Sequence, residues 1–276
     1  MIIDIDLFRT CLQHQNYSES SIRSYLTCMQ QFLDVFKTNG SKAVTIEFIE
    51  KHINWLIKEK EISKSYQKQI LDSIQKYYDL VLNQKLDLTS IYPKNVEYNL
   101  PNCLSKDDIK AMIDSTENLK HKTIICLLYS GGLRLSEILN LTLSNIDTLN
   151  KVIHIYQTKF AKERYVMLSS TLLEMLPAYY EKYKPKHFVI EGQKGMAYSQ
   201  KSVQQVVKLS AKRAGIKIKV TPQCLRHTFA LHLLDNGTDI HQLQELLGHQ
   251  SIKSTENYTH VSDTLKSNIK SPLDSL

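Results

Sequence analysis

The stretch from Ser21 to Phe36, SIRSYLTCMQQFLDVF, decides how the first part of the chain folds. Its apolar side chains recur at intervals of three, four and seven residues, which places them on one stripe of an α-helix. The stripe consists of Ile22, Tyr25, Leu26, Met29, Phe32, Leu33 and Phe36. Helices with such a stripe bury it against one another, so the stretch predicts one member of a small helical bundle.

Further amphipathic helices are expected on both sides of this stretch. The same spacing recurs over residues 46–56 and 70–81, and a short helix is expected near 4–14. Residues 1–82 are therefore predicted to form a four-helix domain. The periodicity is lost over residues 83–104, which are polar and contain prolines, so we interpret them as a linker.

A second domain is predicted to begin at Ser105, because the pattern Ser-x-x-Asp resembles a capping box that opens a helix. Glycines follow several of the later helical stretches. The expected helices cover residues 119–130, a segment from Leu135, and residues 199–214, 222–235 and 239–247. The expected strands are Lys151–Tyr156 and Arg164–Leu168, joined by a turn over 158–162. The predicted fold class is mainly α, with one small antiparallel sheet in the second domain.

The composition is that of a folded globular protein. Hydrophobic residues make up 42% of the 276 residues, and the mean hydropathy is −0.30. The longest apolar run, Thr123–Tyr129, is too short to span a bilayer. The first six residues include acids and no basic leader, so no secretory signal is expected. The five cysteines are scattered and form no CxxC pair, which predicts a reducing cytoplasmic location.

The net positive charge of the chain, +7, comes entirely from the residues after 98. Residues 1–98 contain equal numbers of basic and acidic side chains, 12 of each, whereas the remainder contains 23 basic and 16 acidic ones. A basic excess of this kind favours a polyanionic partner such as nucleic acid. The alternative is that the charge serves solubility alone.

Several classes of chemistry are disfavoured by the motifs that the sequence lacks. It contains no HExxH, no zinc-type Cys/His spacing and no acidic triplet suited to two metals. It also contains neither GxGxxG nor GxxxxGK[ST]. We therefore expect no metal and no cofactor. If the protein acts on phosphodiesters, its own cations must stabilise the transition state and a side chain must attack.

Three segments carry residues suited to that chemistry: Ser130–Leu141, Thr221–Leu233 and Leu246–Val261. Taken singly, each has an ordinary explanation, such as a surface ion pair or a packed tyrosine. Together and in this order they resemble the tyrosine recombinase family, the phage integrases and Xer-type recombinases. The matching phrases are GLRLSE at 132–137, LRHTFA at 225–230, LGH at 247–249 and YTHV at 258–261.

The resemblance implies a fold and a reaction. The first domain would be the family's SAM-like core-DNA-binding domain, and residues 105–261 its catalytic domain. In the family, two arginines and a histidine hold the scissile phosphate, and the matching positions are Arg134, Arg226 and His249. Tyr258 would attack phosphorus to form a 3′-phosphotyrosyl bond, with neither metal nor ATP.

Further site residues follow from the same resemblance. Lys159 matches the lysine that protonates the leaving 5′-oxygen, with Lys162 as the alternative. Glu137 either supports Arg134 or is a surface helix charge. Gln223 stands where the family usually has a histidine, and a glutamine cannot carry a proton at neutral pH. His227 is expected to be a buried structural histidine.

The resemblance also implies an assembly. The partners would be double-stranded DNA with paired inverted-repeat arms and three further copies of the chain, forming a homotetramer on two sites and passing through a Holliday junction. A directionality protein is a further partner, and no membrane is involved. The tail, 262–276, docks on a neighbouring protomer or on its own. We interpret the chain as a mobile-element integrase.

Two alternative functions compete with this interpretation. The first is a non-catalytic DNA-binding relative that occupies or bends a recombination site, and Gln223 is the feature that favours it. The second is a type IB topoisomerase, which uses the same tyrosine chemistry as a monomer. The Xer-like phrases and the short helical first domain weigh against the topoisomerase.

Overall fold

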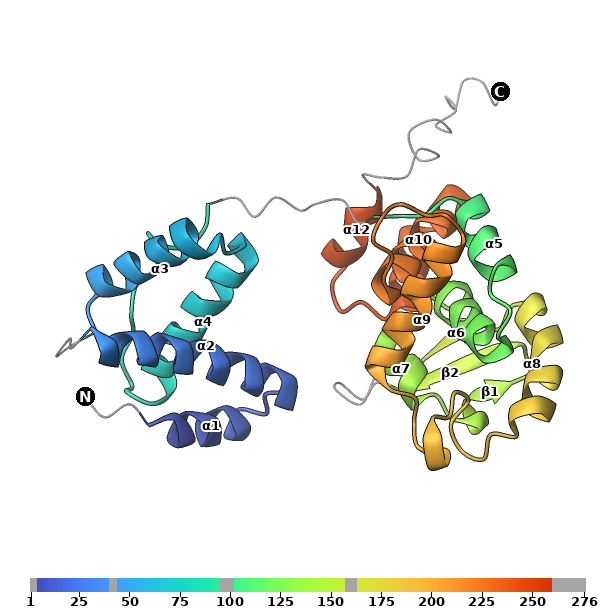
Figure 1. Cartoon of the computed structure of the whole chain (residues 1–276), viewed down its shortest axis with the longest axis horizontal. Helices are drawn as coiled ribbons and strands as arrows, with labels where there is room; N and C mark the ends of the chain where they lie inside the picture. The colour runs from blue at the N-terminus through green and yellow to red at the C-terminus, as the bar shows by residue number, and fades with distance from the viewer. Residues whose placement is uncertain (1–3, 40–43, 95–101, 157–162, 260–276) are drawn as a thin grey trace, which may run out of the picture. The chain divides into compact units, whose positions relative to one another are not determined.

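The computed structural model describes residues 4–39, 44–94, 102–156 and 163–259 of the chain. The chain divides into two compact units, Met1–Tyr98 and Asn99–Leu276 (Figure 1). Both units are mostly helical, and the second contains a three-stranded antiparallel sheet. The predicted fold class is confirmed. In the part of the chain that the structure describes, no helix is both long enough and apolar enough to cross a membrane.

The first unit is the predicted helical bundle. Its helices are α1 (Ile5–His14), α2 (Glu19–Thr38), α3 (Ile46–Lys60) and α4 (Lys64–Leu80). Each helix begins at a residue whose side chain accepts a hydrogen bond from a backbone N–H of the first turn, which satisfies a donor that the helix leaves unpaired. These caps are Asp4, Ser18, Thr45 and Ser63. The α2 stripe is buried against the other helices, apart from the half-buried Tyr25.

Part of the stretch expected to be a linker packs on the first unit. Leu88 and Ile91 are buried in the core of the bundle. The Gln67 amide donates a hydrogen bond of 2.9 Å to the Ile91 carbonyl, and the Tyr92 hydroxyl donates one of 2.7 Å to Asp72. Buried apolar side chains and these two hydrogen bonds therefore hold the segment on the bundle. Residues 95–101 lie outside the described part of the chain.

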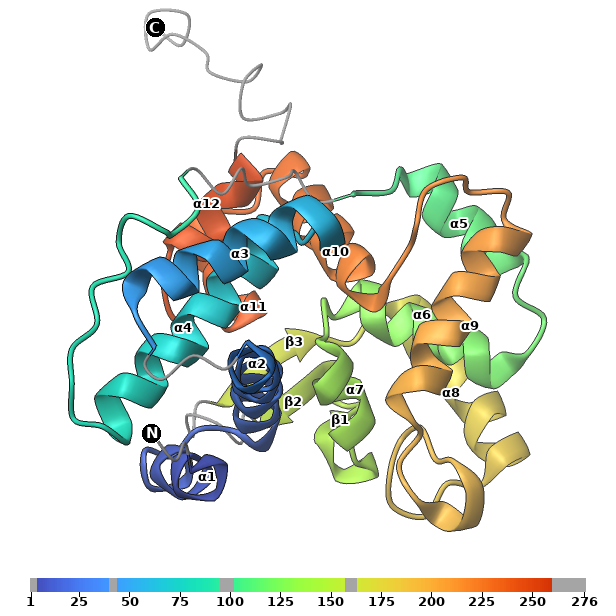
Figure 2. The same cartoon turned by 60° about the vertical axis from the view of Figure 1, so that its left-hand side comes forward.

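In the second unit, helices pack on one face of a small sheet (Figures 1 and 2). The strands are β1 (Ile146–Asp147), β2 (Val152–Tyr156) and β3 (Glu163–Met167), in that order and all antiparallel. The helices are α5 (Lys106–Asp114), α6 (Leu119–Ser130), α7 (Leu135–Asn140), α8 (Ser170–Tyr183), α9 (Gln200–Arg213), α10 (Pro222–Asp235), α11 (Ile240–Leu247) and α12 (Lys253–Thr259). The capping box at Ser105 is present and opens α5. The predicted turn over 158–162 lies outside the described residues.

Packing in this unit brings distant segments together. Helix α10 packs against α6, α11 and α12, and α11 packs against β3, as Figure 2 shows at the end where the chain is orange and red. The core runs from Leu104 through the buried residues of α6 to Leu225. The C-terminal end of α11 therefore lies beside both β3 and the start of α7, and α10 and α12 pack against α11.

The register of the sheet turns one arginine inward. Ile155 pairs with Arg164, and Ile153 pairs with Val166, so these four side chains share the buried face. Tyr156 and Tyr165 lie on the opposite, exposed face. The alternation of β3 thus places a guanidinium in the interior of the second unit.

The break between α6 and α7 requires a glycine. Gly132 has a left-handed φ of +56°, and a Cβ at this position would lie 2.3 Å from the Phe229 ring on α10. Leu133, which follows, is fully buried. The close approach of the turn to α10 fixes where α7 begins, and hence where Arg134 lies.

We expect Gly132→Ala to lower the free energy of unfolding by about 2–5 kcal/mol, because it adds a left-handed alanine and a clash with the Phe229 ring. Gly215→Ala is the matched control: its φ is +75°, but nothing lies within 4 Å of the added Cβ. The control should cost only about 1–2 kcal/mol. Urea denaturation measures both, and equal losses would mean that the Phe229 ring moves aside freely.

Candidate functional site

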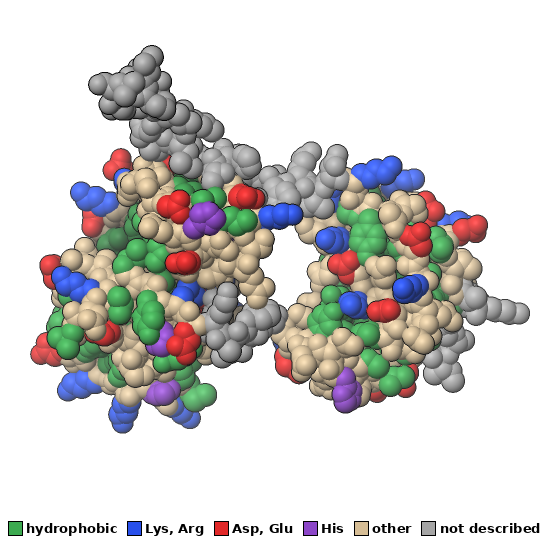
Figure 3. All heavy atoms as spheres, turned by 180° about the vertical axis from the view of Figure 1, so that it is seen from behind, with side chains coloured by type: hydrophobic (Ala, Val, Ile, Leu, Met, Phe, Trp, Pro, Cys, Tyr) green, Lys and Arg blue, Asp and Glu red, His purple; other side chains and the backbone are tan. Residues whose placement is uncertain are grey.

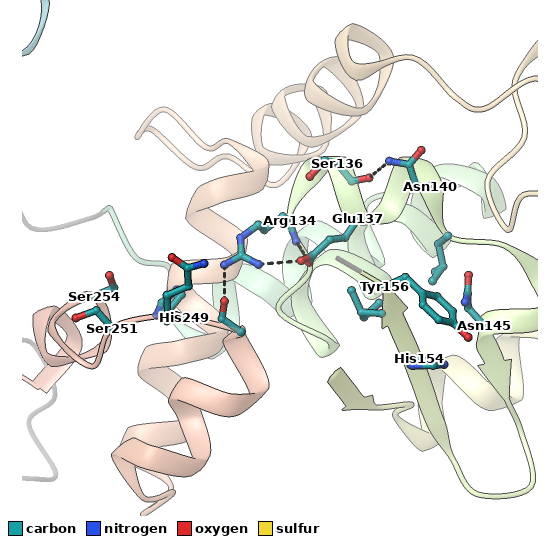
Figure 4. A pocket seen from close by; sticks show the side chains of 14 residues that line it. Arg134, Ser136, Glu137, Asn140, Asn145, His154, Tyr156, His249, Ser251 and Ser254 are labelled. Carbon is teal, nitrogen blue, oxygen red and sulfur yellow. Dashed lines mark hydrogen bonds and ion pairs between the residues drawn. The ribbon is translucent and has the colours of Figure 1, made fainter. Parts of the chain in front are cut away.

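In the second unit, three guanidinium groups lie within ion-pair distance of one buried carboxylate. Glu137 on α7 forms an ion pair of 2.9 Å with Arg134. It also accepts two hydrogen bonds from Arg164 on β3 in a bidentate arrangement, at 2.7 and 2.8 Å. Arg226 on α10 lies 3.8 Å from the same carboxylate. Figure 4 shows Arg134 and Glu137 side by side. Three positive charges against one negative leave the cluster with a positive excess.

Glu137 is a buried carboxylate and not a surface helix charge, since its side chain is only 6% exposed. Burial raises its pKa, but the hydrogen bonds and charge of Arg164, with help from Arg134 and Arg226, outweigh burial and hold the pKa at about 2. Glu137 also accepts a hydrogen bond from the backbone N–H of Arg134, at 2.7 Å. It therefore fixes both the backbone and the guanidinium of that arginine.

The three arginines also hold the end of α11. Three consecutive carbonyls there, which a helix end leaves without partners, each accept a hydrogen bond from a different guanidinium. Arg164 donates to Leu246 at 2.7 Å, Arg226 to Leu247 at 2.5 Å and Arg134 to Gly248 at 3.1 Å. These positive groups also sit at the negative end of the helix dipole. The residue that follows directly is His249.

Arg226 is the most deeply buried of the three arginines, with 1% of its surface exposed. Besides Leu247, it donates a hydrogen bond of 2.6 Å to the carbonyl of Gly132. Burial, followed by the charge of Arg134, lowers its pKa to about 9, so it stays charged at neutral pH. Arg134 differs, because 34% of its side chain remains exposed.

His249 is placed between Arg226 and α12. Its Nε2 atom lies 3.3 Å from an Arg226 nitrogen, and its Nδ1 atom lies 2.9 Å from the hydroxyl of Thr255. Because Arg226 can only donate, Nε2 must accept and Nδ1 must carry the proton. Burial and the nearby arginines lower the pKa of His249 to about 4. The imidazole is therefore neutral at neutral pH.

Tyr258 on α12 is 3% exposed, and its ring is nearly parallel to that of His249, with centroids 6.5 Å apart. Its hydroxyl lies 2.7 Å from Nδ1 of His227 on α10. Burial raises the pKa of this phenol, and the charge of Arg226 lowers it in part. Tyr258 is thus a protonated phenol beside a cationic cluster.

His227 is half-buried, not fully buried as expected, and it makes a contact with the predicted nucleophile that the sequence did not indicate. Its other nitrogen, Nε2, lies 3.1 Å from the amide of the exposed Gln223, one helical turn earlier. Burial and the charge of Arg226 lower the pKa of His227. Gln223, Arg226 and His227 share one face of α10, as the spacing i, i+3, i+4 requires.

The structure brings most of the predicted site residues together and adds one. Arg134, Arg226, His249 and Tyr258 meet at the ends of α10, α11 and α12. Arg164 was missed as a site residue. Its signal was the strand alternation, which puts residues 164 and 166 on the same face. Lys159, Lys162 and the tail 262–276 lie outside the described residues.

A pocket of about 690 Å³ opens beside this cluster (Figure 4). Arg134 and His249 line one end, with the hydroxyls of Ser251 and Ser254 near them, and Tyr156 lies at the other end. The guanidinium and hydroxyl groups suit an anion such as a phosphodiester. Within the described residues, no group of three or more His, Cys, Asp or Glu could hold a metal ion.

The net positive charge is not gathered on the face that Figure 3 shows. Basic and acidic side chains are interspersed there on both units. The charge clue from the sequence therefore does not define a contact surface on that face. The cluster around Glu137 is a more specific electrostatic feature.

Comparison with known proteins identifies two matching families. The sequence model of the phage integrase family matches residues 102–264, and that of the phage integrase N-terminal SAM-like domain matches residues 5–88. The tyrosine recombinase XerD of Staphylococcus epidermidis is 29% identical over 266 residues, covering 89% of each chain.

Solved structures share the fold. The XerH site-specific recombinase bound to palindromic difH substrate aligns with a TM-score of 0.74 at 20% identity, over 94% of this chain and 82% of that one. The lambda integrase tetramer bound to a Holliday junction also aligns with a TM-score of 0.74, at 14% identity, over 97% of this chain and 78% of that one.

We expect Glu137→Ala to lower the free energy of unfolding by about 3–5 kcal/mol, because it leaves the buried Arg164 without its carboxylate. Glu163→Ala on the same sheet is the control, since that carboxylate is 53% exposed and contacts only His154 among the ion pairs of the described residues. It should cost about 1 kcal/mol or less. Thermal or urea unfolding measures both variants. A small loss in Glu137→Ala would show that water replaces the carboxylate.

Proposed function

The chain belongs to the phage integrase family, and we propose that it cleaves and rejoins DNA strands at specific sites through a 3′-phosphotyrosyl intermediate and a Holliday junction. The resemblance to tyrosine recombinases is confirmed by the matching family models. The observation that carries the proposed chemistry is the meeting of Arg226, His249 and Tyr258 beside the half-exposed Arg134.

We assign the phosphate to Arg134, Arg226 and His249. Planar, permanently charged guanidinium groups match phosphate oxygens and offset the charge that grows on them in the transition state. The Glu137 carboxylate keeps two of these groups in fixed positions before DNA binds. Burial and, after it, the charges of the arginines lower the pKa of His249, and a bound phosphate would offset the contribution of those charges.

Tyr258 is the proposed nucleophile. Its attack on phosphorus would replace the bond to the 5′-oxygen with a phosphotyrosyl bond, which keeps the energy needed for rejoining. The reaction would therefore need no ATP, and the chain's own cations would take the place of a metal. Lys159 is the proposed acid for the leaving 5′-oxygen, with Lys162 as the alternative on the same segment between β2 and β3.

Gln223 departs from the family pattern at a position next to this machinery. It can donate a hydrogen bond to a phosphate oxygen but cannot transfer a proton. A non-catalytic relative is not favoured, because Tyr258, both phosphate arginines and His249 are all present. We keep mobile-element integration as the proposed role.

The proposed partners are duplex DNA with inverted-repeat arms and three further copies of the chain. This proposal is supported by relatives of the same fold, since XerH is bound to its difH substrate and lambda integrase forms a tetramer on a Holliday junction. A directionality protein and a tail that docks on a neighbour remain part of the proposal.

Covalent trapping tests this function. Nicked DNA from beside the gene should give a protein–DNA band on a denaturing gel with the wild type and none with Tyr258→Phe. Tyr129→Phe is the matched control, because that phenol also contacts a histidine, His232, at 2.9 Å, and it should keep the band. EDTA should leave the band unchanged. DNA binding without any wild-type band would contradict a catalytic role.

The leaving-group acid can be identified separately. Lys159→Ala should cut cleavage of normal DNA by about 10²–10⁴-fold. A 5′-bridging phosphorothiolate should restore the rate, because sulfur leaves without a proton. Lys162→Ala serves as the comparison and should be only weakly affected on both substrates. Rescue of Lys162→Ala in place of Lys159→Ala would reverse the assignment.

A further inference from the structure

We infer that His227 is the base that accepts the proton of Tyr258, and that Gln223 orients it. This inference rests on the proposed function, since it needs Tyr258 to be the nucleophile. The contact that carries it is the 2.7 Å hydrogen bond between the Tyr258 hydroxyl and Nδ1 of His227. No other nitrogen of a described histidine is hydrogen-bonded to this hydroxyl.

The hydrogen bonds around His227 form a short chain from Gln223 to Tyr258, and the tautomer of the imidazole sets its direction. For Nδ1 to accept from Tyr258, the proton of the neutral imidazole must sit on Nε2. As placed, Nε2 lies 3.1 Å from the amide nitrogen of Gln223, which can only donate. The oxygen and nitrogen of an amide have nearly the same shape, and a half-turn of the amide presents its oxygen to Nε2–H. Gln223 would then hold the tautomer that a base requires.

The surroundings suit a proton transfer from Tyr258 to His227. Burial and the charge of Arg226 lower the pKa of His227, so its imidazole is neutral and can accept a proton at neutral pH. Burial raises the pKa of the Tyr258 phenol, so the phenol does not ionise without help. Arg226 lies near both groups, and its charge favours a developing phenolate.

The other candidate bases are occupied or unsuitable. Nε2 of His249 accepts from Arg226, and its Nδ1 is directed at the Thr255 hydroxyl. The Gln223 amide cannot accept a proton at neutral pH. His227 is the histidine whose Nδ1 atom lies within hydrogen-bond distance of the phenol, at 2.7 Å. One face of α10 thus supplies both Arg226, which is assigned to the phosphate, and His227, the proposed base.

The step balances as follows. The Tyr258 oxygen forms a bond to phosphorus while the bond from phosphorus to the 5′-oxygen breaks. The phenolic proton moves to Nδ1 of His227, and the 5′-oxygen takes a proton from the separate acid assigned above. In rejoining, the 5′-hydroxyl returns its proton to that acid. His227 then returns its own proton to Tyr258 as the phosphotyrosyl bond breaks.

His227→Gln removes the base while keeping a polar side chain of similar reach. We expect single-turnover cleavage to fall by about 10²–10⁴-fold, with DNA binding retained. His232→Gln on the same helix is the matched control, because His232 also contacts a tyrosine hydroxyl, that of Tyr129, at 2.9 Å. It should leave the cleavage rate within a factor of about three, well below the loss of a proton-transfer group.

Replacing Tyr258 with 3,5-difluorotyrosine separates a base from a structural side chain. The fluorinated phenol is more acidic and needs less help to lose its proton. In the His227→Gln variant, this replacement should raise the cleavage rate at least about tenfold, because the defect lies in proton transfer. The 5′-phosphorothiolate should not restore it, because this substrate relieves only the leaving-group step.

The possible outcomes are distinct. A wild-type rate in His227→Gln, or a defect that fluorination leaves unchanged, would overturn the role of His227 while the trapped wild-type adduct still supports the proposed function. Absence of the wild-type adduct would overturn both. Rescue by fluorotyrosine but not by phosphorothiolate is the result we expect.

Discussion

The burial of one carboxylate among three arginines is the interaction on which the second unit depends. Glu137 alone would be costly to bury, and so would Arg164 or Arg226, but each supplies the partner that the other needs. The same guanidinium groups satisfy three consecutive carbonyls at the end of α11. A single cluster therefore joins α7, β3, α10 and α11, and it leaves the next residue, His249, in a fixed place.

The charge balance of this cluster explains how a structural core can also be a binding site. One carboxylate cannot neutralise three guanidinium groups, so a positive excess remains where Arg134 is still partly exposed. Burial, reinforced by that excess, lowers the pKa of His249 to about 4 and that of Arg226 to about 9. Both shifts disfavour positive charge at these groups, and a phosphate bound beside them would offset the part that the neighbouring arginines cause. Positive groups already in position need little reorganisation during the reaction.

The sequence predicted those elements whose burial follows a simple period. The α2 stripe and the strand expected over Lys151–Tyr156 are of this kind, and both are confirmed. The two-residue β1 was missed because it is too short to show a period, and α8, which contains Pro177, was not predicted. Arg164 was overlooked because an arginine in a short strand usually faces water. Its burial depends on Glu137, 27 residues earlier, and only the fold brings them together.

The contact between His227 and Tyr258 depends on the same kind of long-range packing, since 31 residues separate them. From sequence alone, His227 resembled a structural histidine, and Gln223 appeared to be a lost proton carrier. In the fold these two residues are consecutive links of one hydrogen-bonded chain that ends at the phenol. A glutamine is adequate at position 223, because in the proposed mechanism it only has to hold the His227 tautomer that carries its proton on Nε2. The proton itself needs a titratable group at the inner link, and a neutral imidazole stands there.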